Sequence, residues 1–362
     1  MPAHHGDPAL DALLLPFRDG TLAWPADGAL FLRARHGAAL APSEWPGLAC
    51  EQGFQPEVAA LQAAGHVVQA PDDRSWPLVL VLPPRQRDEA RALLADALAR
   101  VKPGGLVVAS MANDAGARSG EADLARLAGP VSQRSKHKCR VFWTQPGDGV
   151  DATLAAQWRA LDAPREIEGG RFRSRPGLFA WDRVDIASRL LADHLPATLA
   201  GRAADLGAGY GFLSAELLQR CPGITALDAY EADDRALPLL RDNLAPFGTR
   251  VPVEVLWHDV AGGLPRRYDV ILTNPPFHAQ SRAERPDIGR AFIAAAAAAL
   301  APGGRLWLVA NRHLPYEAEL ASGFDAVRIV AQHAGFKIVE AVRAAAAPSR
   351  PRAPREARQA RR

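Results

Sequence analysis

The chain contains little cysteine and no long apolar run. Its three cysteines, Cys50, Cys139 and Cys221, are far apart among 362 residues and form no pair at metal-binding spacing. A disulfide framework is therefore excluded as the basis of the fold, and reduced thiols are expected. No apolar run reaches the ~18 residues of a membrane span, and no N-terminal signal pattern is present. These absences predict a cytoplasmic protein that uses no metal and has no membrane association.

The chain does have the length and apolar content for two domains. Hydrophobic residues make up 48% of the 362 positions, so two separate cores can be buried. The net charge of +3 is unevenly spread, because residues 346–362 contain six arginines and a single glutamate. This tail is predicted to be disordered. It is a candidate for gripping phosphates, and a solvated extension without a dedicated role explains it equally well.

The most informative motif is NPPF at residues 274–277, directly after the apolar run 268–273. The run predicts a buried strand, and the two prolines stiffen the turn that follows. A residue before proline takes extended geometry, which aims Asn274 outward from the sheet end. Its amide oxygen and the Pro275 carbonyl can accept hydrogen bonds from one exocyclic amino group, and Phe277 offers a ring face to a flat heterocycle. The motif suits methylation of an amino nitrogen, the alternative being an ordinary proline turn.

A glycine-rich segment, DLGAGYG at residues 205–211, lies upstream of NPPF. Glycine tolerates left-handed backbone and lets the chain approach a ligand closely. The spacing is G-x-G-x-G, whereas nicotinamide dinucleotide sites require G-x-G-x-x-G. The acid before the turn would repel a pyrophosphate and suits an ammonium group. The segment therefore predicts an S-adenosylmethionine site formed by Asp205, Gly207, Gly209 and Gly211.

Two acids follow the next predicted strands. Residues 224–230 predict the second strand, and Glu231 at its end can accept from both hydroxyls of a ribose. Residues 253–257 predict the third strand, and Asp259 just beyond it would accept from an adenine amino group. A solvated strand-end acid is the commoner case for either residue alone, and Asp228 and Asp233 compete with Glu231 for its role. The order of the motifs favours the functional interpretation of both.

This ordered series resembles the class I S-adenosylmethionine-dependent methyltransferases. Four segments of the N-terminal half are also similar to the tandem-domain ribosomal RNA small subunit methyltransferase C family and its large-subunit sister. These segments are LVLPPR at 80–85, KPGG at 102–105, NDAGARS at 113–119 and SKHKCRVF at 135–142. The resemblance covers most of residues 20–345. It implies methylation of guanine N2 in small-subunit (16S) rRNA, with S-adenosylmethionine as the cofactor and ribosomal RNA or the small ribosomal subunit as the partner.

In this interpretation Asn274 and Pro275 orient the amino nitrogen, and Phe277 stacks on the base. Asn274 is also counted among the residues that bind the cofactor. Adenine N6 and protein glutamine are methylated at similar Asn-Pro-Pro-aromatic sites, so these substrates and large-subunit rRNA stay open. An alternative from another class is a non-catalytic RNA-binding assembly factor. The intact Asp205 and glycine turn argue against it, because a domain that has lost catalysis would be expected to lose them.

An internal repeat indicates two related halves. Residues 88–109 and 289–310 each read as a helix, a Pro-Gly-Gly turn and a strand, and LPPR occupies the place of NPPF. Further upstream, LRARHG at 32–37 mirrors LGAGYG at 206–211, with arginine at two of the three glycine positions. Arginine is disfavoured at positive φ and would fill the ligand space. We therefore interpret the first half as a degenerate copy that lacks the cofactor loop and the amide acceptor.

The predicted fold is α/β, with two tandem Rossmann-like class I methyltransferase domains. Each has a mostly parallel, doubly wound sheet with an antiparallel terminal hairpin. Residues 1–160 are the degenerate domain, which supports its neighbour and helps hold RNA, 161–345 are the catalytic domain, and 346–362 are the basic tail. Residues 176–179, before a helix at 185–194, are expected to cover the cofactor or the target base. Such a tandem pseudo-dimer is expected to act as a monomer.

Two basic clusters lie inside the predicted domains. The alternation of the first indicates the outer side of a strand, and the second is interleaved with an aromatic residue. A charge run is more often a solvated face than a nucleic-acid site. The clusters are Arg134, Lys136, Lys138 and Arg140, and Arg171, Arg173 and Arg175.

Overall fold

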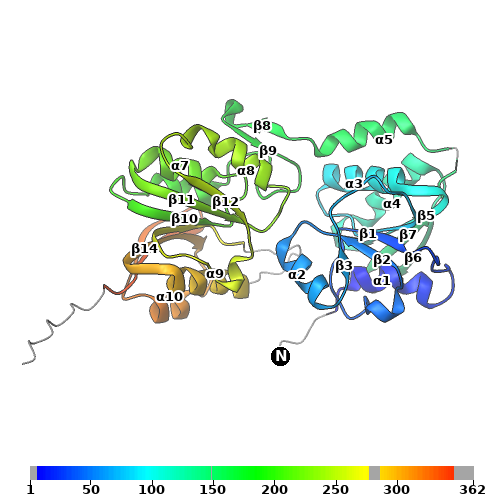
Figure 1. The fold of residues 1–362 in the computed structure, drawn as a ribbon, viewed down its shortest axis with the longest axis horizontal. Helices are drawn as coiled ribbons and strands as arrows, with labels where there is room; N and C mark the ends of the chain where they lie inside the picture. Colours follow the sequence, from blue (N-terminus) through cyan, green and yellow to red (C-terminus); the bar gives the residue numbers. More distant parts are fainter. Residues whose placement is uncertain (1–5, 148, 277–285, 346–362) are drawn as a thin grey trace, which may run out of the picture.

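The protein consists of two α/β halves that lie side by side, each built on a seven-stranded sheet with helices on both faces (Figure 1). A computed structural model describes residues 6–147, 149–276 and 286–345. The predicted α/β fold with two mostly parallel sheets is confirmed. Phe277 and the tail 346–362 lie outside the described residues.

The described residues of the first half form seven strands and five α-helices. The strands are β1 (Ala29–Leu32), β2 (Leu48–Glu51), β3 (Val67–Val68), β4 (Trp76–Val81), β5 (Val101–Ala112), β6 (Ser132–Lys136) and β7 (Cys139–Thr144). The helices are α1 (Pro8–Arg18), α2 (Gln55–Ala63), α3 (Arg87–Arg100), α4 (Ala117–Ala128) and α5 (Ala152–Arg159). Helix α1 packs on one face of the sheet, and α3, α4 and α5 pack on the other.

A short hairpin of β8 (Arg165–Ile167) and β9 (Phe172–Ser174) leads into the second half. Its strands are β10 (Ala200–Leu206), β11 (Gly223–Glu231), β12 (Val253–Trp257), β13 (Tyr268–Thr273), β14 (Leu300–Asn311), β15 (Ala326–His333) and β16 (Phe336–Val342). Its helices are α6 (Ile186–Asp193), α7 (Phe212–Arg220), α8 (Leu237–Leu244), α9 (Pro286–Ala299) and α10 (Glu317–Gly323). The predicted helix at 185–194 is α6.

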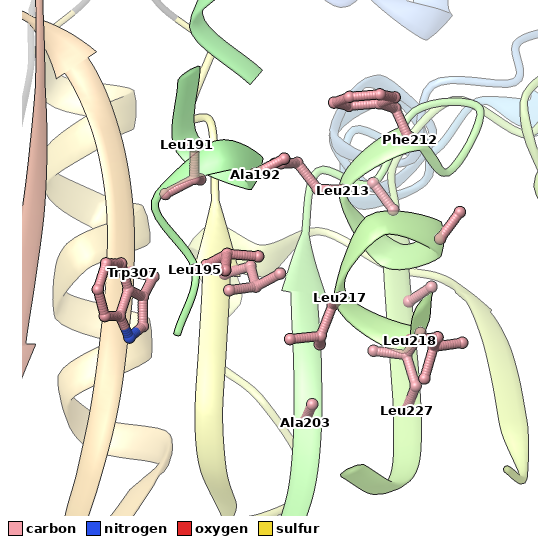
Figure 2. Packing of buried hydrophobic residues seen from close by; sticks show 14 of the residues in the cluster. Leu191, Ala192, Leu195, Ala203, Phe212, Leu213, Leu217, Leu218, Leu227 and Trp307 are labelled. Atoms are coloured by element: carbon pink, nitrogen blue, oxygen red, sulfur yellow. The ribbon is translucent and has the colours of Figure 1, made fainter. Parts of the chain in front are cut away.

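Both faces of the second sheet are covered, which explains why its central strands are continuously apolar. Leu191 of α6 and Leu217 and Leu218 of α7 pack on one face, near Ala203 and Leu227 (Figure 2). Helices α9 and α10 cover the opposite face, and the alanines of α9 are mostly buried there. Neighbouring residues of β10 alternate between the two clusters, as the strand period requires.

The two sheets have the same strand order, β3-β2-β1-β4-β5-β7-β6 and β12-β11-β10-β13-β14-β16-β15. Their registers also agree, because Leu32 pairs with Val81 in the first sheet and Leu206 pairs with Thr273 in the second. In each described sheet one strand, β7 or β16, runs antiparallel to both of its neighbours, and all the other pairs are parallel. This match confirms the internal repeat and aligns the two halves residue by residue.

The first basic cluster does not follow one strand, as its alternation predicted. The chain reverses within it, because His137 and Lys138 have left-handed φ values of 53° and 58° and form the turn between β6 and β7. Arg134 forms an ion pair with Asp19, which directly follows α1, and Arg140 forms one with Glu121. Lys136 and Lys138 are exposed.

The halves join through two equivalent loops that contact each other with approximate two-fold symmetry. The Gln55 amide donates to the Ala232 carbonyl at 2.8 Å, and the Asp234 amide donates to the Gly53 carbonyl at 2.9 Å. Phe54 and Asp233 form an antiparallel bridge between these bonds. In the alignment of the halves, 53–55 is equivalent to 232–234, so each loop makes the same pair of bonds.

An ion-pair network lies beside this junction. Glu89 of α3 is buried and pairs with Arg33 of its own half and with Arg235 of the other half. Arg235 also donates to Asp162 and to the Pro176 carbonyl, both at 2.7 Å. Burial raises the pKa of Glu89, and the two guanidinium groups oppose that rise. The carboxylate of Glu89 is thus the charge that holds two cations at the junction.

We predict that Glu89→Ala destabilises the protein far more than loss of a surface pair. Removing Glu89 leaves two partly buried guanidinium groups without it, which costs about 3 kcal/mol of unfolding free energy. The matched control is Glu44→Ala, because Glu44 pairs with Arg18 at the exposed surface. Its loss should cost less than about 1 kcal/mol. Urea denaturation followed by circular dichroism measures both, and equal small losses would contradict the role given to Glu89.

Candidate active site

Three parallel strands of the second sheet end at one level and bring the predicted site residues together. Leu206 of β10 is in register with Tyr230 of β11 and with Thr273 of β13. The next residues along the chain are Gly207, Glu231 and Asn274, which therefore lie at one sheet edge. The edge is the carboxyl end of the parallel strands, where ligands bind in open α/β sheets.

The glycine turn has the backbone that its sequence predicted. Gly207, Gly209 and Gly211 have φ values of 73°, 57° and 97°, all left-handed. The amides of Gly207 and Ala208 both donate to the Tyr230 carbonyl at 2.9 Å, which ties the turn to β11. A Cβ on Gly209 would meet no atom within 4 Å, so the turn leaves open space at its tip. Such space is what a closely approaching ligand requires.

Asp205 lies directly beneath this turn and is fully buried. Its Oδ2 accepts a hydrogen bond from the Ser214 hydroxyl at 2.7 Å, while Oδ1 has no hydrogen-bond partner within the described part of the chain. Burial raises the pKa of Asp205 to about 7, and the hydrogen bonds from Ser214 oppose the rise. A buried carboxylate oxygen without a hydrogen-bond donor is a ready binding partner for a cation or for a donor group of a ligand.

Glu231 ends β11 and links the glycine turn to the junction loop. Its Oε2 accepts from the Gly209 amide at 2.7 Å, and its Oε1 accepts from the amides of Ala232 and Asp233 at 2.7 and 2.8 Å. Burial raises the pKa of Glu231, and these backbone hydrogen bonds oppose it. Asp228, the competing acid, lies inside the sheet and accepts from the Tyr268 hydroxyl at 2.7 Å. It is not at the edge.

Asp259 lies beyond the end of β12. Its Oδ1 accepts from the Ala261 amide at 2.9 Å and begins a short 3-10 helix, Val260–Gly262. The Nε2 of His258 beside it donates to the Gly263 carbonyl at 2.6 Å. The predicted acid therefore lies on the loop that follows the third strand.

Asn274 follows β13 and its amide is held in one orientation. Its Nδ2 donates to Asp185 Oδ2 at 3.0 Å and to Ser188 Oγ at 2.9 Å. Its Oδ1 is shielded from solvent and has no hydrogen-bond partner among the residues described. Pro275 is buried behind it. Phe277, the predicted stacking residue, lies outside the described residues.

Sequence reasoning missed Asp185 and Ser188. The local signal was present, because Asp185 is the N-cap of α6 and accepts from the Ser188 amide at 2.8 Å. An N-cap aspartate three residues before a serine is an ordinary helix start, however, and carries no information on a contact 89 positions away. Only the fold brings the start of α6 to the end of β13.

Large apolar side chains are exposed on the segment before α6 and at the first residue of this helix. Phe179 and Ile186 are 66% and 65% exposed, respectively, and Ile186 follows Asp185 directly. The Tyr210 hydroxyl of the glycine turn donates to the Arg183 carbonyl at 3.4 Å, which places this segment against the turn. The covering role expected for residues 176–179 stays a prediction, because this contact is made by Arg183.

The equivalent edge of the first half carries none of these groups. The residues at the aligned positions are Phe31 for Asp205, Arg33 for Gly207, Arg35 for Gly209, Gln52 for Glu231 and Leu82 for Asn274. Arg33 still has the left-handed φ of the turn, at 53°, and so keeps the glycine conformation despite its side chain. Both arginines are used in ion pairs, Arg33 with Glu89 and Arg35 with Asp7.

Groups for other kinds of site are missing from the described ranges. Residues 6–147, 149–276 and 286–345 contain no cluster of three or more histidine, cysteine or acidic side chains that could hold a metal ion. The same ranges contain no helix both long and apolar enough to cross a membrane. The three cysteines are buried and unpaired.

Comparison with known proteins places the site in a family. Residues 169–340 match the methyltransferase small domain. The ribosomal RNA small subunit methyltransferase C of Salmonella paratyphi A is 30% identical over 76% of this chain and 78% of its own, and that of Shewanella halifaxensis is 29% identical over 80% and 84%. The solved T. thermophilus 16S rRNA N2 G1207 methyltransferase RsmC, in complex with AdoMet and guanosine, superimposes with a TM-score of 0.77 at 25% identity. That match covers 94% of this chain and 93% of the other.

The glycine turn gives a stability prediction. Gly209→Ala should cost only the left-handed strain of a non-glycine residue, about 1–2 kcal/mol. Gly211→Ala carries the same strain, and its Cβ would also lie 2.7 Å from Leu240 Cδ1 in the core. It should therefore cost roughly 1–3 kcal/mol more. Urea denaturation midpoints of the two variants measure the difference in stability. Equal midpoints would contradict the prediction, because they would show that the Leu240 side chain moves aside without cost.

Proposed function

Because the chain belongs to the ribosomal RNA small subunit methyltransferase C family, we propose that it methylates the exocyclic N2 amino group of a guanine in 16S rRNA, using S-adenosylmethionine. The observation that carries the proposal is the clamped amide of Asn274. Its free Oδ1 is a hydrogen-bond acceptor at the sheet edge, beside a glycine turn with open space. An amino group is a donor with two protons, and it is the substrate that such an acceptor fits.

The residues present at the edge fit the cofactor. Asp205 has a buried oxygen without a donor, which suits the ammonium of the methionine moiety. Gly207, Gly209 and Gly211 would let the chain pass close to the cofactor. Glu231 would accept from the ribose hydroxyls, and Asp259 from the adenine amino group. When bound, S-adenosylmethionine supplies a methyl group already activated by its sulfonium charge.

The chain's own contribution to the reaction is orientation. The amino lone pair of guanine is delocalised into the ring, so the nitrogen is a weak nucleophile. Hydrogen bonds from its two N–H groups to Asn274 Oδ1 and to the Pro275 carbonyl would fix the direction of the nitrogen and stabilise the positive charge that develops on it. Phe277 is proposed to stack on the base, with a stacking free energy of roughly 1–3 kcal/mol.

We assign the two halves different roles. Residues 161–345 carry the catalytic site, and residues 1–160 support it and help to hold RNA. The first half retains the strand order but has lost the acceptor and the cofactor acid, which supports this division. The two-fold junction already pairs the halves within one chain, which supports action as a monomer. We place the protein in the cytoplasm, where ribosomal RNA is modified.

The basic groups differ in what they can offer to RNA. Arg171, Arg173 and Arg175 pair with Glu216, Asp242 and Asp162, so their charge is largely compensated. Lys136 at the end of β6 and Lys138 in the turn that follows are exposed and make no salt bridge to any described residue. We propose that this turn contacts RNA phosphates and that the tail 346–362 adds to the contact.

Transfer of label from S-adenosylmethionine tests the function. Undermethylated small subunits, naked 16S rRNA and large subunits would each be incubated with labelled cofactor, followed by nucleoside analysis. Label in N2-methylguanosine from small-subunit RNA is expected. Label in adenosine, in large-subunit RNA or in protein glutamine would correct the substrate, and cofactor binding without transfer would favour a non-catalytic assembly factor.

Asn274→Ala should lower kcat by about 10²–10³-fold, the loss typical of one electrostatic contact in the transition state. The cofactor Kd should change far less, because the amide oxygen is assigned to the base. Single-turnover rates and calorimetric Kd values separate the two effects. Comparable losses in both would contradict the role assigned to Asn274.

Cofactor affinity should rise with pH through the pKa of Asp205. The carboxyl is neutral below about pH 7 and anionic above it, because burial raises its pKa to about 7. An ammonium binds the anion, so the affinity should increase roughly eightfold between pH 6 and 7.5, following the ionised fraction. Calorimetric titration measures this change. Asp205→Asn keeps the contact to Ser214 without the titration and should flatten the profile, and a pH-independent wild type would refute the assignment.

A further inference from the structure

Asn274 is useful to an amino group only in one of its two amide orientations. If the side-chain amide turned by half a rotation, Nδ2 would face the guanine amino group, and two donors would oppose each other. The two orientations differ little in shape, so packing alone does not select between them. Hydrogen-bond partners behind the amide must therefore decide which end faces the substrate.

Asp185 and Ser188 supply those partners. A carboxylate only accepts hydrogen bonds, so Asp185 Oδ2 at 3.0 Å requires the nitrogen of Asn274 on its side. Ser188 Oγ at 2.9 Å takes the second proton of the same nitrogen. Both protons of the amide are used, and Oδ1 is left buried with no partner in the described chain. The reverse orientation would place two oxygens against each other.

The degenerate half provides an internal comparison. Its helix α1 also begins with an N-cap aspartate, Asp7, which accepts from the Leu10 amide three residues on. Leu10 thus aligns with Ser188, and Leu82 aligns with Asn274. Both leucines lie in one apolar cluster, and Asp7 pairs with Arg35. Where the amide has been lost, the hydroxyl behind it has been lost too, while the capping aspartate persists.

We propose that Asp185 and Ser188 are positioning residues that fix the Asn274 amide with its oxygen toward the target amino group. This inference rests on the proposed methyl transfer to an amino nitrogen. The helix start of α6 then has two tasks, since the same Asp185 oxygen caps the helix and holds the amide. The start of α6 and the acceptor are connected through this one side chain.

An exchange of the two side-chain types tests the proposal. Asn274→Asp keeps an acceptor toward the base and places a second carboxylate against Asp185. Two carboxylates at this distance cannot both stay ionised in place, so kcat should fall by about a hundredfold or more. Adding Asp185→Asn restores a donor–acceptor pair, because the new amide donates to the new carboxylate. The double variant should recover at least about tenfold in kcat over Asn274→Asp, the equivalent of one good hydrogen bond.

The control for net charge is Asp182→Asn in the Asn274→Asp background. Asp182 is exposed, lies three residues from Asp185 and pairs with Arg183. Asp182→Asn should therefore give no recovery of kcat. Recovery of kcat by both Asp185→Asn and Asp182→Asn, or by neither, would overturn the proposal. In the wild type one Asp185 oxygen makes both contacts, so the amide introduced at position 185 has to cap α6 through its oxygen while its nitrogen donates to position 274. Asparagine is as good an N-cap as aspartate, and an unchanged melting temperature of the double variant checks that the start of α6 is kept.

Ser188→Ala gives a second measurement that leaves the cap carboxylate and the net charge unchanged. We expect kcat on small-subunit RNA to fall roughly five- to tenfold, with the cofactor Kd and the KM for RNA nearly unchanged. An unchanged kcat would contradict the positioning role of Ser188. The wild-type enzyme is assayed beside each variant, so absence of methylation in the wild type would reject the proposed function itself, whereas active but unaffected variants would reject only the positioning role.

Discussion

The shared end level of β10, β11 and β13 is the constraint on which the site depends. Parallel pairing fixes Leu206 beside Tyr230 and Thr273, so the residues that follow must meet at one edge. The glycine turn, the strand-end acid and the amide acceptor are separate in sequence and become neighbours only through this register. A shift of one residue would move each side chain to the opposite face of the sheet. The apolar clusters on both faces hold the register.

The same constraint acts in the first half, where the edge has acquired another use. Arg33 keeps the left-handed turn of a cofactor loop and directs its guanidinium to Glu89, which also binds Arg235 of the other half. The loop 53–55 pairs with its counterpart 232–234. Since 232–234 follows Glu231 directly, the degenerate half contacts the chain just behind the proposed ribose acid. In the first half, the residue that replaces a cofactor-loop glycine therefore belongs to the ion-pair network that supports the second half.

Local patterns predicted much of the second half. The run 268–273 coincides with β13 because its apolar residues end at a polar residue followed by prolines, and the glycines at 207–211 take left-handed φ because the turn requires it. The Asp185–Asn274 contact could not be predicted, since it joins residues remote in sequence. The reversal at His137 and Lys138 was missed because the segment contains no glycine, asparagine or aspartate, the residues that most often mark a left-handed hairpin turn. Strand ends are encoded locally, whereas side-chain partners are set by the fold.

The central claim is that one fold occurs twice in this chain and only the second copy retains the chemistry of its sheet edge. The stoichiometry of S-adenosylmethionine binding, measured by isothermal titration calorimetry on the full chain, tests it most directly. One cofactor per chain is predicted, lost when Gly207→Arg introduces the side chain that Arg33 has in the first half. Two cofactors per chain, or one that still binds the Gly207→Arg variant, would contradict the account.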